Sequence, residues 1–282
     1  MIRKLTIVCL LLIVSISVQA QAPACTRPEL QAAVDSYVAA QGAGDVSKMA
    51  LTADAKFFEN MAEVGKADGM WHTALPIAYS RSILDTARCR TFTEVIVTEG
   101  GHPYVLGTRL TVTGGKIAEV NGLVTDTGDW LFNANAYLKY SKAEDWSAPA
   151  EHTPAQTLVD SANRYLDVFA DKQIKVPWGI PCARLEGGAY TNRDNKPDAS
   201  CNIGVPQGVL YIVNRSFVVD EDMGIVNVFC RFGNSSTGMP DSHTFRMVKG
   251  EFHQIHTLSV NLNAATPSPQ AADDGSMIRQ NQ

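Results

Sequence analysis

The sequence Thr244-Phe245-Arg246-Met247-Val248-Lys249-Gly250-Glu251-Phe252-His253-Gln254-Ile255 places apolar and polar side chains largely in alternation on both sides of a Lys-Gly dipeptide. A period of two is typical of strands with one buried face, and glycine adopts the positive φ of a tight turn without strain. The stretch therefore predicts a β-hairpin. A matching hairpin is predicted over residues 109–120, and its turn glycine, Gly115, precedes Gly250 by 135 positions.

The two hairpins close two halves of the chain that share one order of elements. Each half opens with apolar residues at helical spacing, after Val34-Asp35-Ser36 in the first half and after Val159-Asp160-Ser161 in the second. Further runs rich in β-branched and aromatic residues lie between helix and hairpin, at 92–98, 104–112, 209–219 and 224–232. This order predicts an α+β fold with two tandem domains, each with helices packed on a curved antiparallel sheet.

The predicted boundaries follow changes in composition. Residues 1–22 are a predicted signal peptide, because a basic start and an apolar run precede a small-x-small cleavage site that ends at Ala20. The first lobe is predicted at 23–146 and the second at 155–262, and the polar tail 263–282 is predicted to be disordered. Cleavage near Ala20 predicts a protein secreted to the periplasm or the extracellular space.

Composition narrows the classes of partner. A hydrophobic fraction of 45% with 19% charged residues is that of a globular protein with a substantial core. The formal net charge is −5 and no basic run is present, which argues against nucleic acid as a partner. No segment after the signal peptide is apolar enough to predict a membrane span. A small hydrophobic or aromatic molecule is the expected partner, and homo-oligomer formation is left open.

Five cysteines remain after removal of the signal peptide, and an exported protein accommodates this odd number most simply with two disulfides and one buried thiol. Cys182 and Cys201 flank a polar loop that a bridge would close, and Cys25 is placed to tie the mature N-terminus to Cys89. Cys230 lies in an apolar run and is predicted to be buried. No two cysteines stand two to four residues apart, so no metal site is predicted.

Several strings carry a resemblance to a known family. The chain resembles the SnoaL-like group of the cystatin-type α+β cone superfamily, and within it an exported two-lobed family without settled function, in Phe58-Glu59-Asn60, Gly115-Lys116-Ile117, residues 128–134, 176–190 and 241–246. The resemblance implies tandem cone domains. Superfamily members are cofactor-free hydratases, isomerases, epoxide hydrolases, cyclases and a lyase that deformylates lignin-derived diarylpropanes, or they only bind small hydrophobic ligands. No cofactor is therefore expected.

The segment from Trp71 to Asp85 concentrates side chains that transfer protons. Tyr79 is the candidate acid or base, and Arg81, two residues later, would stabilise its phenolate. His72, with an ordinary pKa of about 6.5, or Asp85 would be the proton partner. The alternative interpretation is a structural ion pair between Arg81 and Asp85, with Tyr79 and Trp71 packed at the rim of the lobe.

Other polar residues are assigned by their neighbours and their spacing. Glu59 and Asn60 follow an apolar pair, so one of them is predicted to face the pocket, and together with Trp71 they are the candidate substrate-binding residues. In the second half, Arg184 and Glu186 share one face of a predicted strand. The expected role of this pair is a buried ion pair that stabilises the disulfide-closed loop.

The remaining histidines do not assemble into a site by sequence alone. His243 and Arg246 fall on opposite faces of a strand, as do His253 and His256. No Gly-x-Ser-x-Gly, Walker or Gly-x-Gly-x-x-Gly string is present, which argues against hydrolase and nucleotide-binding functions. The sequence thus predicts a cofactor-free lyase or isomerase with its pocket in the first lobe. The alternative is a non-catalytic exported ligand-binding or scaffold protein.

Overall fold

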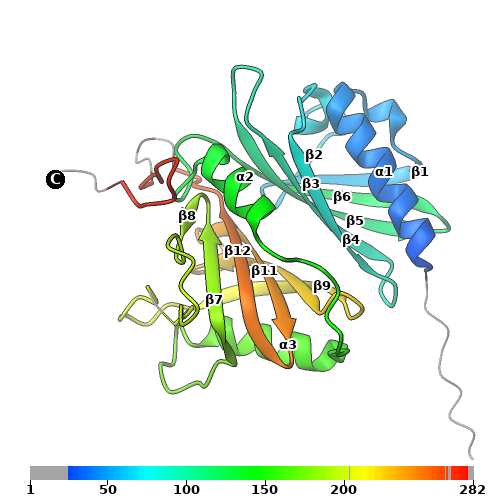
Figure 1. Ribbon diagram of the computed structural model, residues 1–282. Helices are drawn as coiled ribbons and strands as arrows, with labels where there is room; N and C mark the ends of the chain where they lie inside the picture. Colours follow the sequence, from blue (N-terminus) through cyan, green and yellow to red (C-terminus); the bar gives the residue numbers. More distant parts are fainter. Residues whose placement is uncertain (1–24, 203, 264, 266–267, 279–282) are drawn as a thin grey trace, which may run out of the picture.

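The computed structural model describes residues 25–202, 204–263, 265 and 268–278, so the predicted signal peptide lies outside the described residues. Two lobes follow each other along the chain, each built on a six-stranded sheet with helices packed against it (Figure 1). The predicted α+β class and the tandem arrangement are confirmed. Within the described part of the chain, no helix is long and apolar enough to cross a membrane.

The first lobe begins with α1 (Arg27–Ala43), and its sheet order is β2-β1-β6-β5-β4-β3. Thr26 caps the helix in a capping box with Glu29, and Gly44 ends it in the left-handed conformation that favours glycine. The other elements are η1 (Val46–Lys48), β1 (Leu51–Glu59), β2 (Ala62–Val64), η2 (Met70–His72), β3 (Tyr79–Asp85), β4 (Arg90–Val97), β5 (Tyr104–Thr113), β6 (Lys116–Thr125) and α2 (Ala134–Ala143).

The second lobe repeats this plan with the sheet order β8-β7-β12-β11-β10-β9. The register repeats as well, since Asp85 faces Arg90 across β3 and β4, and Asp220 faces Ile225 across β9 and β10. Corresponding residues of these strands are 135 positions apart, which is also the offset of the two hairpin glycines. The elements are α3 (Ala155–Asp167), β7 (Trp178–Glu186), β8 (Ala189–Tyr190), β9 (Ile212–Asp220), β10 (Ile225–Phe232), β11 (Met239–Val248) and β12 (Glu251–Ser259).

Each lobe buries its core between its first helix and one face of its sheet. In the first lobe, Tyr37 of α1 belongs to one apolar cluster with Phe57 and Trp71. In the second lobe, Tyr165 of α3 packs edge-on against Phe245 of β11, with ring centroids 4.9 Å apart. Burial of each such side chain contributes about 1.5 to 3 kcal/mol. Trp71 is 2% exposed, so it is a core residue and not the rim or substrate contact that was predicted.

The lobes are joined where β3 lies beside β9. Oδ2 of Asp85 accepts a hydrogen bond from the Val219 N–H at 2.9 Å, and Oδ2 of Asp220 accepts one from the Leu84 N–H at 2.9 Å. Both aspartates are 1% exposed. The two contacts are reciprocal, because Asp85 and Asp220 occupy equivalent positions in their lobes and each binds the backbone of the other lobe. Asp85 therefore contributes to the contact between the lobes.

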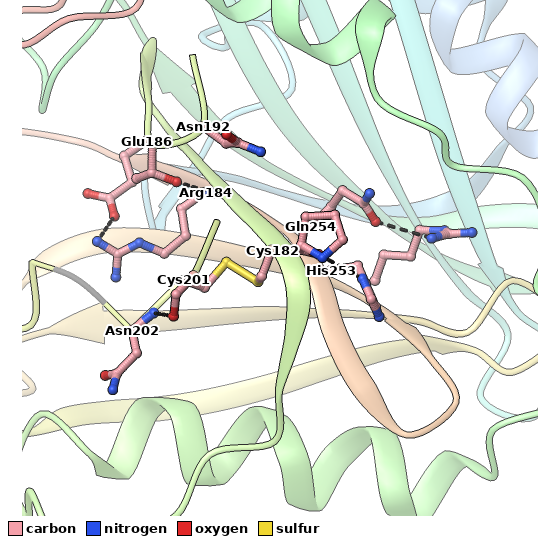
Figure 2. Close-up of a disulfide and its surroundings, with 12 residues drawn as sticks. Cys182, Arg184, Glu186, Asn192, Cys201, Asn202, His253 and Gln254 are labelled. Carbon is pink, nitrogen blue, oxygen red and sulfur yellow. Dashed lines mark hydrogen bonds and ion pairs between the residues drawn. A yellow bond between two sulfur atoms is a disulfide. The ribbon is translucent and has the colours of Figure 1, made fainter. Parts of the chain in front are cut away.

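Both expected disulfides are present, Cys25–Cys89 and Cys182–Cys201. Among the described residues, Cys230 is the free cysteine, and it is fully buried. Figure 2 shows the Cys182–Cys201 bridge attached to β7, the strand that also carries Arg184. The bridge thus fixes the polar loop next to this strand.

Replacing Cys182 with serine should lower the free energy of unfolding by about 2 to 5 kcal/mol, because the bridge restricts the unfolded chain and the site is buried. Thermal unfolding followed by circular dichroism measures the change. The double variant Cys182→Ser/Cys201→Ser is the matched control for effects of a newly freed thiol. An unchanged midpoint in both variants would refute the prediction.

The C-terminal segment differs from the predicted disordered tail. Residues 268–278 hydrogen-bond to the rest of the chain: the Leu131 N–H donates to the Pro269 carbonyl at 2.7 Å, and the Tyr190 N–H donates to the Gly275 carbonyl at 2.9 Å. Composition misleads here because backbone hydrogen bonds, and not a run of apolar side chains, position the segment.

Candidate functional site

The first-lobe residues selected from the sequence do not converge on a cavity. His72 is exposed, and its Nε2 lies 2.8 Å from a backbone carbonyl oxygen. The side chains of Glu59 and Asn60 accept backbone hydrogen bonds at 2.7 and 2.9 Å. Tyr79 packs against an apolar cluster that includes both lobes, and Trp71 lies in the core. These contacts stabilise the lobe and its junction.

Arg81 pairs with a residue that the sequence did not single out. Its guanidinium forms a short ion pair with Glu94 of β4, and Nη2 lies 3.0 Å from Nδ1 of His256 on β12. Asp85 pairs instead with Arg88, at 3.2 Å. The alternative interpretation predicted an ion pair for Arg81, and Arg81 does form one. Its partner is Glu94 and not the predicted Asp85. Arg81 contributes to the contact between the lobes.

Glu94 and His256 form the centre of a buried network between the lobes. Tyr137 of α2 donates a hydrogen bond to Glu94 at 2.9 Å, and Nε2 of His256 lies 2.6 Å from Glu144. Burial alone would raise the pKa of Glu94, but the charges of Arg81 and His256 outweigh it and hold the pKa at about 2. Burial lowers the pKa of His256, and the two carboxylates raise it further than burial lowers it.

The Glu94 network should make stability depend on pH in acid. The pKa of this carboxyl is 4.5 in the ordinary case and about 2 in the folded protein. Its contribution is therefore present above pH 4.5 and is lost as the pH falls towards 2. The variant Glu94→Gln lacks this titration. In differential scanning calorimetry, the gap between the midpoints of wild type and variant should narrow over that range, and a constant gap would contradict the assignment.

A chamber of about 120 Å³ lies inside the second lobe. Its wall is mostly apolar, Arg184, Glu186 and His243 supply the ionisable groups, and Thr257 and Ser259 add two hydroxyls. A second cavity of about 410 Å³ shares Trp130, Arg184, Glu186 and Gly204 with the chamber and is bordered by the C-terminal segment. An apolar cavity with a few converging polar groups is the usual form of a small-molecule site.

Strands β7 and β11 position the polar groups of this site. Arg184 and Glu186 are two residues apart on β7, and Asp241 and His243 are two apart on β11, so each pair projects from one face of its strand. The expected ion pair forms, with 2.8 Å between Nη2 of Arg184 and Oε1 of Glu186 (Figure 2). Arg246, an odd number of positions from His243, points away from the chamber and donates to a backbone carbonyl at 2.8 Å.

Arg184 is buried at the boundary of the two cavities, with 5% of its side chain exposed. Its Nε has no hydrogen-bond partner within the described part of the chain. A Cβ at Gly204 would lie 2.9 Å from Nη2, so glycine there leaves space for the guanidinium. Burial lowers the pKa of Arg184, but Tyr165 and Glu186 raise it by more. The guanidinium is therefore charged, and a ligand oxygen would satisfy its free N–H.

His243 is supported from behind by a carboxyl group. Its Nδ1 lies 3.3 Å from Oδ2 of Asp241, whose Oδ1 accepts a hydrogen bond from Ser259 at 2.8 Å. Burial raises the pKa of Asp241 to about 8 and lowers that of His243 to about 3. Burial thus favours the uncharged form of both groups. Because Asp241 occupies Nδ1, Nε2 is the ring nitrogen that a ligand in the chamber would meet.

The first lobe fills the equivalent space with other side chains. The repeated register matches His243 to Thr108, whose hydroxyl lies 2.6 Å from that of Tyr37. It also matches Arg184 to Phe57. Arg184 pairs with Ile255 of β12, and Phe57 pairs with Val120, which is the equivalent residue of β6. Glu186 has a counterpart in Glu59, whose carboxylate accepts a backbone hydrogen bond at 2.7 Å. Arg184 and His243 are thus the lining residues that the second lobe adds to the shared fold.

Sequence reasoning missed Asp241 and His243 as site residues and assigned Arg184 and Glu186 to stability only. The sequence feature that could have identified them is their spacing. The members of each pair are two residues apart on a predicted strand, which puts both on one face. That both faces line one chamber depends on the strand order β7-β12-β11, which no local pattern encodes.

Comparisons with known proteins bear on the second lobe and on the fold. A family model described as a domain of unknown function (DUF8021) matches residues 151–259, from the start of the second lobe to the end of β12. No significant match was found among proteins of curated function.

Two solved structures are similar to parts of the chain. One is an NTF-2-like protein of unknown function from Burkholderia xenovorans LB400, with 16% identity and a TM-score of 0.29, over 35% of this chain and 84% of that one. The other is AclR, a proposed hydroxylase from Streptomyces galilaeus, with 18% identity and a TM-score of 0.27, over 36% of this chain and 91% of that one. Similarity at this level carries no argument about activity.

Proposed function

We propose that the protein binds a small, largely apolar compound with a polar head in the second-lobe chamber and converts it by acid/base chemistry, as a cofactor-independent lyase or isomerase. One observation carries the proposal: Arg184, Glu186 and His243 line a mostly apolar chamber, where the first lobe has Phe57 and Thr108 in the places of Arg184 and His243. The SnoaL-like resemblance of the sequence supports the same reaction classes.

The three side chains have separate roles in a proton transfer next to a carbonyl group. Glu186 accepts a proton from the carbon beside the carbonyl, and the electron pair moves onto the carbonyl oxygen. Arg184 stabilises that oxygen with its unpaired Nε–H. His243, oriented by Asp241, donates a hydrogen bond or a proton to the same oxygen through Nε2. Return of the proton to another carbon completes an isomerisation, and loss of a leaving group completes an elimination.

The dimensions of the site limit the substrate. The chamber of about 120 Å³ admits only a small head group, and the body of a larger ligand would extend into the cavity of about 410 Å³. A lignin-type diarylpropane, the substrate of a deformylating lyase in the superfamily that the sequence resembles, would have to occupy both. Small aromatic ketones and aldehydes are the simpler candidates.

Export is part of the proposal. The basic and apolar start of the chain supports it, and so do two disulfides, which persist in oxidising compartments. The N-terminal sequence of the protein recovered outside the cytoplasm tests it. A mature chain that begins near Gln21 is expected, and a chain that retains Met1 inside the cell would refute it.

The experiment is a screen in D₂O of small aromatic ketones, aldehydes and diols, including diarylpropanes, without added cofactor. Proton NMR detects exchange of the hydrogen beside the carbonyl, and any product formed. Exchange or turnover of at least one compound is expected. Compounds that bind without exchange would favour the alternative of a non-catalytic binding protein, and a screen without binding would overturn both.

A further inference from the structure

Three different donor atoms meet behind the chamber wall. Cys230 lies directly across from Asp241 in the pairing of β10 with β11, and His243 follows two residues later on β11. Sγ of Cys230 lies 4.0 Å from Oδ2 of Asp241 and 4.0 Å from Nδ1 of His243, and these last two atoms are 3.3 Å apart. All three residues are buried. The three atoms thus form a compact triangle of sulfur, nitrogen and oxygen.

We propose that Cys230, Asp241 and His243 form a binding site for a divalent transition-metal ion of the zinc class. A tetrahedral zinc ion needs separations of about 3.3 Å between nitrogen and oxygen ligands and about 3.5 Å from either to sulfur. The nitrogen–oxygen separation already matches, and the sulfur atom has only to move inward by a small side-chain rotation. The donor set excludes magnesium and calcium, which prefer oxygen ligands alone.

The surroundings of the three donors fit this role. Ser259 donates to Oδ1 of Asp241 at 2.8 Å, which orients the carboxylate and leaves Oδ2 turned to the other two donors. Ser259 and His243 also line the chamber, so an ion can enter from there and take its fourth ligand, a water or a bound molecule, from the same side.

The first lobe shows that the fold does not require polar groups at these positions. The pair Val95 and Leu106 occupies the register positions of Cys230 and Asp241. Both are fully buried apolar residues, with 0% and 2% exposure. The second lobe therefore replaces a packed apolar pair by a thiol and a carboxyl, which costs stability unless the groups are paired or bind an ion.

This inference does not depend on the proposed reaction. An ion on Nδ1 would leave Nε2 of His243 directed at the chamber, so metal binding and ligand binding can be measured separately. In the metal-bound protein the ion on Nδ1 would replace the direct contact with Asp241 as the interaction that orients the imidazole.

The test uses the untagged, oxidised full chain after dialysis against a chelator. Isothermal titration with Zn²⁺ should give one site per chain, and Co²⁺ in its place should give the absorption of a thiolate-bound tetrahedral ion. Cys230→Val, which copies the first lobe, and Asp241→Asn should both abolish the signal. His253→Gln, at a half-buried histidine outside the cluster, should leave it unchanged.

Ser259→Ala provides the test of the supporting hydrogen bond. Zn²⁺ binding should weaken about 10- to 100-fold, and Ser259→Thr should restore it. Circular dichroism establishes that each variant is folded. Absence of zinc binding by the folded wild type would overturn the proposal, as would unchanged stoichiometry and cobalt absorption in folded Cys230→Val. The cluster would then be a hydrogen-bonded group only.

Discussion

Replacing Glu94 with alanine should lower the free energy of unfolding by about 3 to 5 kcal/mol, because the change removes the carboxylate that pairs with Arg81 and leaves His256 with Glu144 alone. The side chains of Glu94 and His256 are 2% and 1% exposed, so water cannot replace the lost carboxylate. Tyr137 also loses the acceptor of its hydroxyl. Urea unfolding followed by tryptophan fluorescence measures the effect.

The control is an ion pair of the same chemistry in solvent. Asp194 and Lys196 are 3.4 Å apart and mostly exposed, so Asp194→Ala should cost at most about 1 kcal/mol. If Glu94→Ala were as mild as this control, the network would not hold the lobes together. A two-step transition in Glu94→Ala would show, in addition, that the lobes then unfold separately.

Replacing His243 with asparagine should reduce turnover of a substrate from the screen by about 10²- to 10⁴-fold, the usual contribution of a general acid or base. Asparagine retains a polar atom near the position of Nδ1, so the contact with Asp241 is kept and only Nε2 is lost. Melting curves would establish that the variant folds. The measurement is the initial rate of proton exchange or product formation.

The first lobe supplies the matched controls. His72→Asn makes the same change at an exposed histidine, and Tyr79→Phe removes the hydroxyl that the sequence favoured as acid or base. Both variants should retain wild-type turnover. Loss of turnover in Tyr79→Phe with full activity in His243→Asn would return the chemistry to the first lobe.

Sequence patterns are sufficient to predict those elements that depend on residues close together in the chain. The glycine turns at Gly115 and Gly250, the alternation beside them and the helical spacing after Val34 and Val159 correspond to elements of the structure. The Arg184–Glu186 ion pair likewise follows from a spacing of two on a strand. In each case the residues that determine the feature are close together in the chain.

Contacts between distant segments lie beyond such patterns. His256 and Glu94 are 162 positions apart, and their contact exists only because β12 of the second sheet packs beside the first sheet, where Tyr137 of α2 joins the same cluster. The sequence around Tyr79 and Arg81 therefore predicts a reactive cluster, although the structure places these residues at the contact between the lobes. Residue type alone does not separate the two cases, because tyrosine, arginine and carboxylate side chains occur both in buried interfaces and in active sites.

The proposed function requires that ligands bind between Arg184 and His243. A crystallographic screen with small aromatic ketones and carboxylic acids, soaked into crystals of the wild-type protein, tests this most directly. We expect electron density in the second-lobe chamber, with a ligand oxygen on Nε of Arg184 and the ligand in contact with His243. Density confined to the first lobe, beside Tyr79 and Arg81, with the second-lobe chamber empty, would contradict it.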